Sequence, residues 1–415
     1  MMKKIIILLV LCSAAVLASC LKDVETARQY ELRITVKAPA GEDVDISEIS
    51  KLRITAVNSL TGEQTDMFPE NGAVIAKVSG GEYNFRAIGF AEEFTVNGFA
   101  EMSVYDDATF DFQLNVAGSN GLIFKEVYMS GSKIGYGYWK DGFYEIYNNS
   151  NETLYLDGII LGIVDFNFGA PTPWVDGDGK LLDRYPMANF TVYFPGSGQD
   201  YPILPRESKV LATLPIDHTA LEISEGDVPS AADLSNADWD IFIPPPYSGG
   251  DTDVLGIPNM VVAANVFGLD FMPNMSGQSI ILAQVKDAAG NALYGDAVRE
   301  YCQKAENRMQ KPGSSFYHTM IPKDFVIDAI EIVYGDPTQR NKILHKEQDV
   351  GMTWYSGDGG LNTTGIYAGK SFRRKVLDFV DGKPVYQDTN NSSEDFILGG
   401  CRPPTPGVHP TEIDE

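Results

Sequence analysis

The segment Asp176-Gly177-Asp178-Gly179 places two carboxylates close together among glycines. Carboxylate oxygens are ligands that calcium prefers, and glycine lets a loop wrap closely around a cation. The terminal glutamate of a twelve-residue calcium loop is missing, because the chain continues as Lys180-Leu181-Leu182. Two interpretations therefore stay open: calcium bound by Asp176 and Asp178, or an acidic turn in a protein without a cofactor. The same alternatives apply to three further aspartates, Asp251, Asp253 and Asp358.

A second polar segment runs from Asp388 to Phe396 and consists mainly of short side chains that hydrogen-bond to nearby backbone. Such residues satisfy their own backbone in consecutive Asx and Ser/Thr turns. We interpret the segment as a structural clamp near the end of the chain, with ligand contact as the alternative. The clamp residues are Asp388, Asn390, Asn391, Ser392 and Asp395.

Catalytic chemistry has little support in the sequence. Glu126 and Glu145 lie on two neighbouring predicted strands and have the residue types of a glycosidase pair, although a structural role is the stronger interpretation. The sequence contains no Gly-x-Ser-x-Gly, His-Glu-x-x-His, P-loop or Gly-x-Gly-x-x-Gly signature. Its four histidines are scattered without metal-ligand spacing. We therefore predict no catalytic residues and no enzymatic activity.

The first nineteen residues have the organisation of a signal peptide. Lys3 and Lys4 precede the apolar run Ile5–Leu17. This run is too short to cross a bilayer as a helix, which takes about 20 residues, but it suits the apolar core of an export signal. We expect residues 1–19 to be a leader and residues 20–29 to be a tether.

Leu17-Ala18-Ser19-Cys20 resembles a bacterial lipobox, in which the cysteine thiol forms a thioether to a diacylglycerol. The resemblance implies that Cys20 is lipidated and that multiple acyl chains hold the protein stably at a membrane. An ordinary secretory signal is the alternative. The following Cys20-Leu21-Lys22-Asp23-Val24-Glu25 is similar to the surface-export signal of Bacteroides-group lipoproteins, which implies the outer membrane and its cell-surface side rather than its periplasmic side.

Export also bears on whether the remaining cysteines can form a disulfide, and the net charge bears on the choice of partner. An oxidising compartment permits a disulfide between Cys302 and Cys401. The 415 residues carry a net charge of −25, so a nucleic acid is not a predicted partner. Arg373-Arg374-Lys375 forms a small basic spot that we interpret as charges on a strand edge, with a lipid head group or a partner as the alternative contact.

Short alternating segments between turns predict a mostly β protein of tandem β-sandwiches. Residues 30–117 form the first, and the Gly72-Ala73-Val74 and Gly81-Glu82-Tyr83-Asn84-Phe85 segments resemble transthyretin-like and carboxypeptidase-regulatory-like sandwiches. One or two short helices are expected, including Ala297–Met309. Pro171–Pro205 and Pro244–Pro258 are expected to be ordered loops.

Residues 118–415 resemble a lamin-tail domain, an immunoglobulin-like sandwich, expanded here by long insertions. The resemblance rests on Leu122–Tyr128, Phe143–Ser150, Ile203–Ala212, the Gly277–Gly290 region and Asp388–Phe396. The whole layout resembles an uncharacterised family of Bacteroides-group lipoproteins of unknown function.

Three functions remain open from these features. The first is a surface-anchored binding or accessory module beside an outer-membrane transporter of the TonB-dependent type. The second is a structural or adhesive envelope protein, and the third is a hydrolase within the long insertions.

Overall fold

The computed structural model describes most of the chain from Arg28 to Gly400. The described ranges are 28–39, 44–91, 94–119, 121–129, 131–135, 138–165, 171–248, 250–268, 270–272, 277–335, 340–355, 367, 369–380 and 382–400. The predicted leader, the lipidation residue Cys20, most of the tether, Asp358 and Cys401 lie outside these ranges. In the described part, no helix is long and apolar enough to cross a membrane.

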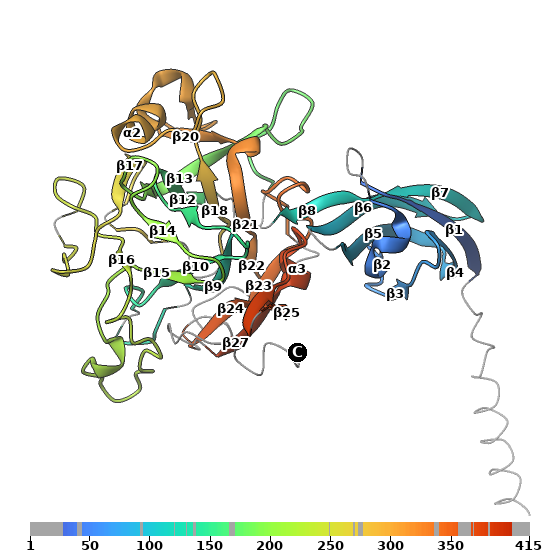
Figure 1. Ribbon diagram of the computed structural model, residues 1–415, viewed down its shortest axis with the longest axis horizontal. Helices are drawn as coiled ribbons and strands as arrows, with labels where there is room; N and C mark the ends of the chain where they lie inside the picture. The colour runs from blue at the N-terminus through green and yellow to red at the C-terminus, as the bar shows by residue number, and fades with distance from the viewer. Residues whose placement is uncertain are drawn as a thin grey trace, which may run out of the picture.

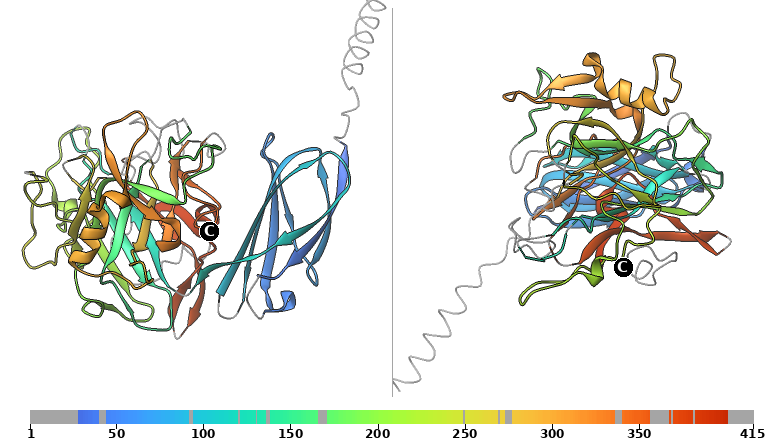
Figure 2. Two further views of the ribbon diagram at one scale, coloured as in Figure 1. Left: turned by 90° about the horizontal axis from the view of Figure 1, so that it is seen from above. Right: turned by 90° about the vertical axis from the view of Figure 1, so that its left-hand side faces the viewer.

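Two β units lie side by side and account for nearly all of the regular structure (Figure 1). The smaller, blue-to-cyan unit holds the N-terminal strands, and the larger, green-to-red unit holds the rest. Figure 2 shows the same pair from above, with strand β8 (Asn115–Ser119) leading from one to the other. The expectation of a mostly β fold with several sheets is confirmed.

The first unit consists of a five-stranded sheet, β3-β2-β5-β6-β8, and a three-stranded sheet, β4-β1-β7. Alternate residues of both sheets, such as Leu32, Ile54 and Phe85, point into a shared core. Its strands are β1 (Gln29–Lys37), β2 (Ser50–Asn58), β3 (Gln64–Met67), β4 (Ala73–Ser79), β5 (Gly81–Phe90), β6 (Phe94–Val104), β7 (Ala108–Gln113) and β8 (Asn115–Ser119). Strand β8 pairs with β6 up to Ser119, two residues past the predicted boundary.

Two larger sheets form the second unit, and the main core lies between them. Phe124 and Tyr144 contribute to this core from the six-stranded sheet β16-β15-β10-β9-β24-β27, and Leu161 and Phe190 from the seven-stranded sheet. The six strands are β9 (Leu122–Tyr128), β10 (Phe143–Asn148), β15 (Ser208–Ala212), β16 (Trp239–Asp240), β24 (Lys370–Arg374) and β27 (Phe396–Gly400).

The seven-stranded sheet has the order β19-β20-β13-β12-β18-β21, with β17 also paired to β13. Its strands are β12 (Ile159–Val164), β13 (Arg184–Tyr193), β17 (Val261–Asn265), β18 (Ile280–Gln284), β19 (Arg308–Gln310), β20 (Tyr317–Pro322) and β21 (Val326–Ile330). Three small ladders complete the unit: β11 (Leu154–Tyr155) with β14 (Pro202–Ile203), β22 (Ile332–Tyr334) with β23 (Thr353–Tyr355), and β25 (Val376–Val380) with β26 (Lys383–Tyr386).

The prediction of a loop over Pro171–Pro205 is wrong in its centre, where β13 is a ten-residue strand. This strand could not be recognised from the sequence pattern, because both of its faces are buried. Phe190 and Val192 face the main core, whereas Met187 and Tyr193 face a second core on the outer side of the sheet. A strand that is apolar on both faces loses the alternation used to recognise strands.

Two helices are present among the described residues, α2 (Asp296–Gln303) and α3 (Ser392–Asp395). The predicted helix Ala297–Met309 is too long at its C-terminal end, because Lys304 adopts an extended backbone and Arg308 begins β19. Helix α2 inserts Val298 and Cys302 into the second core, so it covers the outer side of the seven-stranded sheet.

Candidate functional site

A cleft of about 740 Å³ lies on the outer face of the six-stranded sheet, beside the β25–β26 hairpin. Along β10, Tyr144 and Ile146 point into the main core, so Glu145 and Tyr147 point the other way, into the cleft. The lining comprises Lys125, Glu145, Tyr147, Arg206, Glu207, Ser208, Val210, Asn236, Asp238, Gly382, Lys383, Pro384 and Tyr386.

The floor of the cleft carries a buried ion pair. The ammonium of Lys125 lies 2.9 Å from Oε1 of Glu145, and both side chains are about 95% buried, with exposures of 5% and 4%. Strand β9 has a bulge opposite Glu145, which brings Lys125 to the side of its partner. The same ammonium lies 5.8 Å from the ring centroid of Tyr386.

Tyr147 fixes the hairpin to the sheet. Its hydroxyl donates a hydrogen bond to the carbonyl oxygen of Pro384 at 2.7 Å, and its ring packs edge-on against Tyr386 with centroids 4.8 Å apart. Burial raises the pKa of Tyr147 above its ordinary value, so the hydroxyl remains a donor. These two contacts, together with the paired hydrogen bonds between the Asn149 side chain and the Tyr386 backbone, hold the β25–β26 hairpin beside the cleft.

Cationic and polar groups surround the rim. Arg206 donates to the side chain of Asn149 at 3.2 Å and to that of Asn151 at 3.1 Å, and its buried Nε has no partner among the described atoms. The Lys383 ammonium donates to the carbonyl of Pro205 at 3.2 Å. This arrangement suits a polar ligand with an anionic group, because guanidinium and ammonium donors prefer charged acceptors.

The structure brings Glu126 and Glu145, for which a structural role was the stronger interpretation, directly opposite one another on β9 and β10. Glu145 is ion-paired with Lys125, and Glu126 accepts a hydrogen bond of 2.5 Å from the Ser371 hydroxyl. Both carboxylates are thus engaged within the sheet, which is the geometry that a structural role requires.

The predicted clamp residues lie between the two units, around α3. Asp395 accepts from the backbone N–H and hydroxyl of Thr389 at 2.8 and 2.7 Å, and from the Asn391 N–H at 3.2 Å. Ser392 donates its N–H to Asp349, while the Asn390 amide donates to the carbonyl of Glu347. The segment thus hydrogen-bonds both to itself and to distant backbone; its role as a clamp stays a prediction.

The same segment also contacts the first unit. Arg53 pairs with Glu394 at 2.9 Å, and the Arg86 guanidinium donates to the Ser393 hydroxyl at 3.3 Å. The side-chain amide of Asn97 donates a buried hydrogen bond of 2.8 Å to the carbonyl of Thr389. We call the contacts of Arg53, Arg86 and Asn97 with α3 and its preceding turn the junction.

The basic spot at Arg373-Arg374 is not a surface feature, and the strand-edge interpretation is wrong for both arginines. They are 2% and 1% exposed on β24, which lies between β9 and β27. Arg374 contacts three carboxylates: Asp328 at 2.8 Å, Asp388 at 2.9 Å and Asp395 at 3.6 Å. The sequence could not reveal this, because the three partners are remote in the chain or belong to the polar clamp segment.

One guanidinium carries a single positive charge, so Arg374 cannot balance the negative charges of all three carboxylates. Burial raises the pKa of Asp328 to about 6 and that of Asp395 to about 7, and repulsion from Asp388 adds to the effect while Arg374 opposes it. Burial lowers the Arg374 pKa, but attraction from Asp328, Asp388 and Asp395 outweighs it, so the pKa is raised and the guanidinium stays ionised. The cluster therefore retains protons well above the pH at which an exposed aspartate releases them.

The Asp176–Gly179 turn, interpreted either as a calcium site or as an acidic turn, is held by hydrogen bonds to its own backbone. Oδ1 of Asp176 accepts the N–H groups of Asp178 and Lys180 at 2.9 and 3.0 Å, and these bonds lower the pKa of Asp176. Within the described ranges, no group of three or more His, Cys, Asp or Glu side chains is arranged to hold a metal.

Cys302 is fully buried on α2, and burial raises the pKa of its thiol to about 12. Because Cys401 lies outside the described residues, the disulfide stays a prediction.

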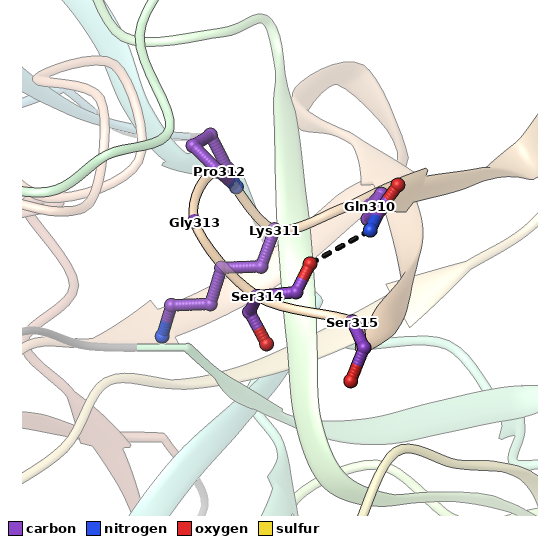
Figure 3. Close-up of a pocket in the computed structure, with 6 residues that line it drawn as sticks. All are labelled: Gln310, Lys311, Pro312, Gly313, Ser314 and Ser315. Carbon is purple, nitrogen blue, oxygen red and sulfur yellow. Dashed lines mark hydrogen bonds between the residues drawn. The ribbon is translucent and has the colours of Figure 1, made fainter.

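A second hollow is formed by the hairpin turn between β19 and β20 (Figure 3). All six lining residues come from this single turn, in which the Gln310 amide donates to the Ser314 carbonyl at 2.7 Å. Lys311 pairs with Asp165 at 2.7 Å. A hollow with one short segment as its wall provides no opposing groups to enclose a ligand, so the cleft beside β25–β26 is the stronger candidate.

Fold and cleft together define a mostly β protein of paired sheets with a polar cleft on an outer sheet face. Residues 204–400 match the family described as "Protein of unknown function (DUF4876)". This stretch supplies most of the cleft lining, whereas Lys125, Glu145 and Tyr147 precede it.

A DUF4876 family protein from Bacteroides thetaiotaomicron has a similar crystal structure, with 21% identity over 92% of this chain and 96% of that chain and a TM-score of 0.54. This similarity supports the fold. A DUF3823 family protein from Parabacteroides merdae aligns over 71% of this chain and 97% of that chain. Its identity of 8% and TM-score of 0.18 are too low to indicate a shared fold. No curated protein matches the chain.

Proposed function

We propose that the protein is a lipid-anchored binding module of the outer cell surface and that the cleft beside β25–β26 holds its ligand. The cleft carries this proposal because its volume, about 740 Å³, is within the range of small-ligand sites and its walls come from five separate chain segments. The carboxylates with raised pKa values, such as Asp328 and Asp395, do not line it. The proposed role is therefore binding rather than catalysis.

The chemistry of the cleft favours a polar ligand that carries an anionic group, such as an acidic glycan or a peptide. Arg206 and Lys383 supply cationic donors at the rim, and Ser208 and Asn236 add neutral hydrogen-bonding groups. Two carboxylates, Glu207 and Asp238, also line the cleft, and Asp238 is paired with Lys209 at 2.9 Å. The rings of Tyr147 and Tyr386 add a small apolar surface. A module of this kind would deliver its ligand to an outer-membrane transporter of the TonB-dependent type.

A binding screen tests the cleft directly. The mature protein is titrated with acidic and neutral oligosaccharides and peptides by calorimetry, and each hit is repeated with Lys383→Ala and with Lys77→Ala. Lys77 is an exposed lysine on β4 of the first unit and serves as the matched control. We expect weaker binding only in Lys383→Ala; equal loss in both variants, or no hit, contradicts the cleft as the ligand site.

Lipid anchoring and partnership are tested in cells. Metabolic labelling with a palmitate analogue is expected to mark the wild type, and Cys20→Ala is expected to lose both the label and the membrane fraction. Surface proteolysis of intact cells distinguishes the cell surface from the periplasmic side. Cross-linking that recovers no envelope transporter speaks against the accessory role.

A structural or adhesive role is the second candidate, and the junction is the observation that favours it. Hydrogen bonds and an ion pair fix the two units to each other, as a spacer requires. This function predicts no saturable small ligand. An unrecognised hydrolase in the long insertions is the third candidate, and it predicts catalytic turnover by the purified mature protein.

A further inference from the structure

Two side-chain oxygens with no partner lie next to each other at the edge of the six-stranded sheet. Asp240, on β16, is 0% exposed, and its Oδ1 has no hydrogen-bond partner among the described residues. Asn259 faces it across a parallel β-bridge, and its Oδ1 is likewise buried and unpartnered there. Buried acceptors without a donor are costly, so the two oxygens are candidates for contact with a cation or with water.

The intervening loop adds a third oxygen-bearing group. The side-chain N–H of Asn259 donates to Oδ1 of Asp253 at 3.1 Å. The Oδ1 of Asn259 takes no part in this hydrogen bond. The Val254 N–H donates to Oδ2 of Asp240 at 3.2 Å, so the Asp240 carboxylate lies over the start of the same loop. Asp240, Asp253 and Asn259 thus belong to one loop and its two ends, which are linked by these hydrogen bonds and by the β-bridge.

Nearby positive charge is used elsewhere. Lys140 contacts Asp251 at 3.3 Å and Asp270 at 3.5 Å, and it also donates to the carbonyl of Gly250. No ion pair with a lysine or arginine is formed by Asp240 or Asp253 within the described chain. Lys140 therefore neutralises Asp251 and Asp270. Asp240 and Asp253 offer oxygen ligands but have no cationic side chain paired with them in the described chain.

We propose that Asp240, Asp253 and Asn259 form a calcium-binding site. Calcium takes six to eight oxygen ligands in flexible geometry, so side-chain oxygens of this loop, backbone carbonyls and water together meet its demand, whereas magnesium requires a stricter octahedron. Two carboxylates give a site of low charge, for which we expect a Kd of about 10⁻⁴–10⁻³ M, as in extracellular modules. The site is distinct from the Asp176–Gly179 turn and from the cleft.

Terbium luminescence and calorimetry test the proposal with the mature, full-length protein. Trp239 precedes Asp240 in the chain and provides an indole donor for terbium bound at the site. After treatment with EDTA, we expect one calcium per chain, a rise in Tm with calcium and a smaller one with magnesium. We also expect calcium to displace sensitised terbium emission.

Substitutions locate the bound ion. Asp253→Ala changes an exposed residue and is expected to fold normally while weakening calcium binding about 10-fold or more. Asp240→Asn should behave similarly, and the control Asp176→Asn should bind as the wild type does. No effect of calcium up to millimolar concentrations overturns the proposal, because water then satisfies the orphan oxygens. Binding that persists in Asp253→Ala and Asp240→Asn but disappears in Asp176→Asn also overturns it.

Discussion

Individual side chains show where the sequence is informative and where it is not. The short polar residues of Asp388–Phe396 could be interpreted locally, because Asx-type hydrogen bonds span only a few residues. The contact of Lys125 with Glu145 could not, because it depends on a bulge in β9, and that of Arg374 with Asp328 could not, because it joins two strands that are not consecutive in the chain. Carboxylates that compete for one cation are recognisable only after folding places them together.

The buried pair of Lys125 and Glu145 supports a prediction for stability. Lys125→Met leaves the Glu145 carboxylate buried without its cation, which should cost about 3–5 kcal/mol in the free energy of unfolding. The double variant Lys125→Met/Glu145→Gln should recover much of this loss, since neither charge remains. Urea unfolding followed by tryptophan fluorescence measures both. A double variant no more stable than Lys125→Met would contradict this account.

The Arg374 cluster predicts a pH dependence. Folding raises the pKa values of Asp328 to about 6 and Asp395 to about 7, so the folded state holds protons that the unfolded chain releases near pH 4. Their contribution to stability is fully present below about pH 4 and is lost as the pH rises through about 7.

Thermal unfolding between pH 4.5 and 8 measures this loss, which we expect to be on the order of 1–3 kcal/mol. Asp328→Asn should reduce the pH dependence, whereas Asp238→Asn, on the cleft side of the molecule, should leave it intact. A steeper dependence in Asp328→Asn would show that the sign is wrong.

At the scale of elements, whether a strand could be predicted from the sequence depended on how many of its faces are buried. Strands of the first unit, such as Tyr30–Val36 and Gly81–Ala87, alternate in sequence and appear as β1 and β5. Strand β13 does not alternate, because cores lie on both sides, and the prediction there was a loop. The cleft could not be predicted either, since the β25–β26 hairpin reaches the sheet through long-range contacts of Tyr147.

Phe190 tests the position of β13 in the core. Phe190→Ala removes a fully buried ring and should destabilise the protein by about 3–5 kcal/mol. Phe379→Ala is the matched control, because its ring on β25 is 43% exposed and should cost far less. Equal effects in chemical denaturation would mean that β13 is not a core strand.

On the scale of the whole molecule, the sequence indicated two β units but not their contact. The junction joins residues about 300 positions apart, such as Arg53 with Glu394 and Asn97 with Thr389. Sequence patterns report local periodicity and cannot report which outer surfaces meet. The mostly β class was accessible from sequence, whereas the relative placement of the units required the structure.

The junction predicts how the units respond to substitution. Arg53→Ala combined with Asn97→Ala removes an ion pair and a buried hydrogen bond and should let the units separate. We expect a larger radius of gyration in small-angle scattering, with circular dichroism unchanged. Lys77→Ala is the control. An unchanged scattering profile would show that other contacts hold the units together.

Strand pairing in the first unit has a mechanical consequence. Gln29 pairs with Ser79, and β4 turns through Gly80 into β5, which opens at Gly81 opposite Val104. Ser119 pairs with Phe94, at the other end of β6. The start of β1 and the exit of β8 therefore lie at opposite ends of this sandwich. With Cys20 anchored in a membrane and a load on the second unit, tension would run along the strands and shear their hydrogen bonds together, rather than peel them apart one by one.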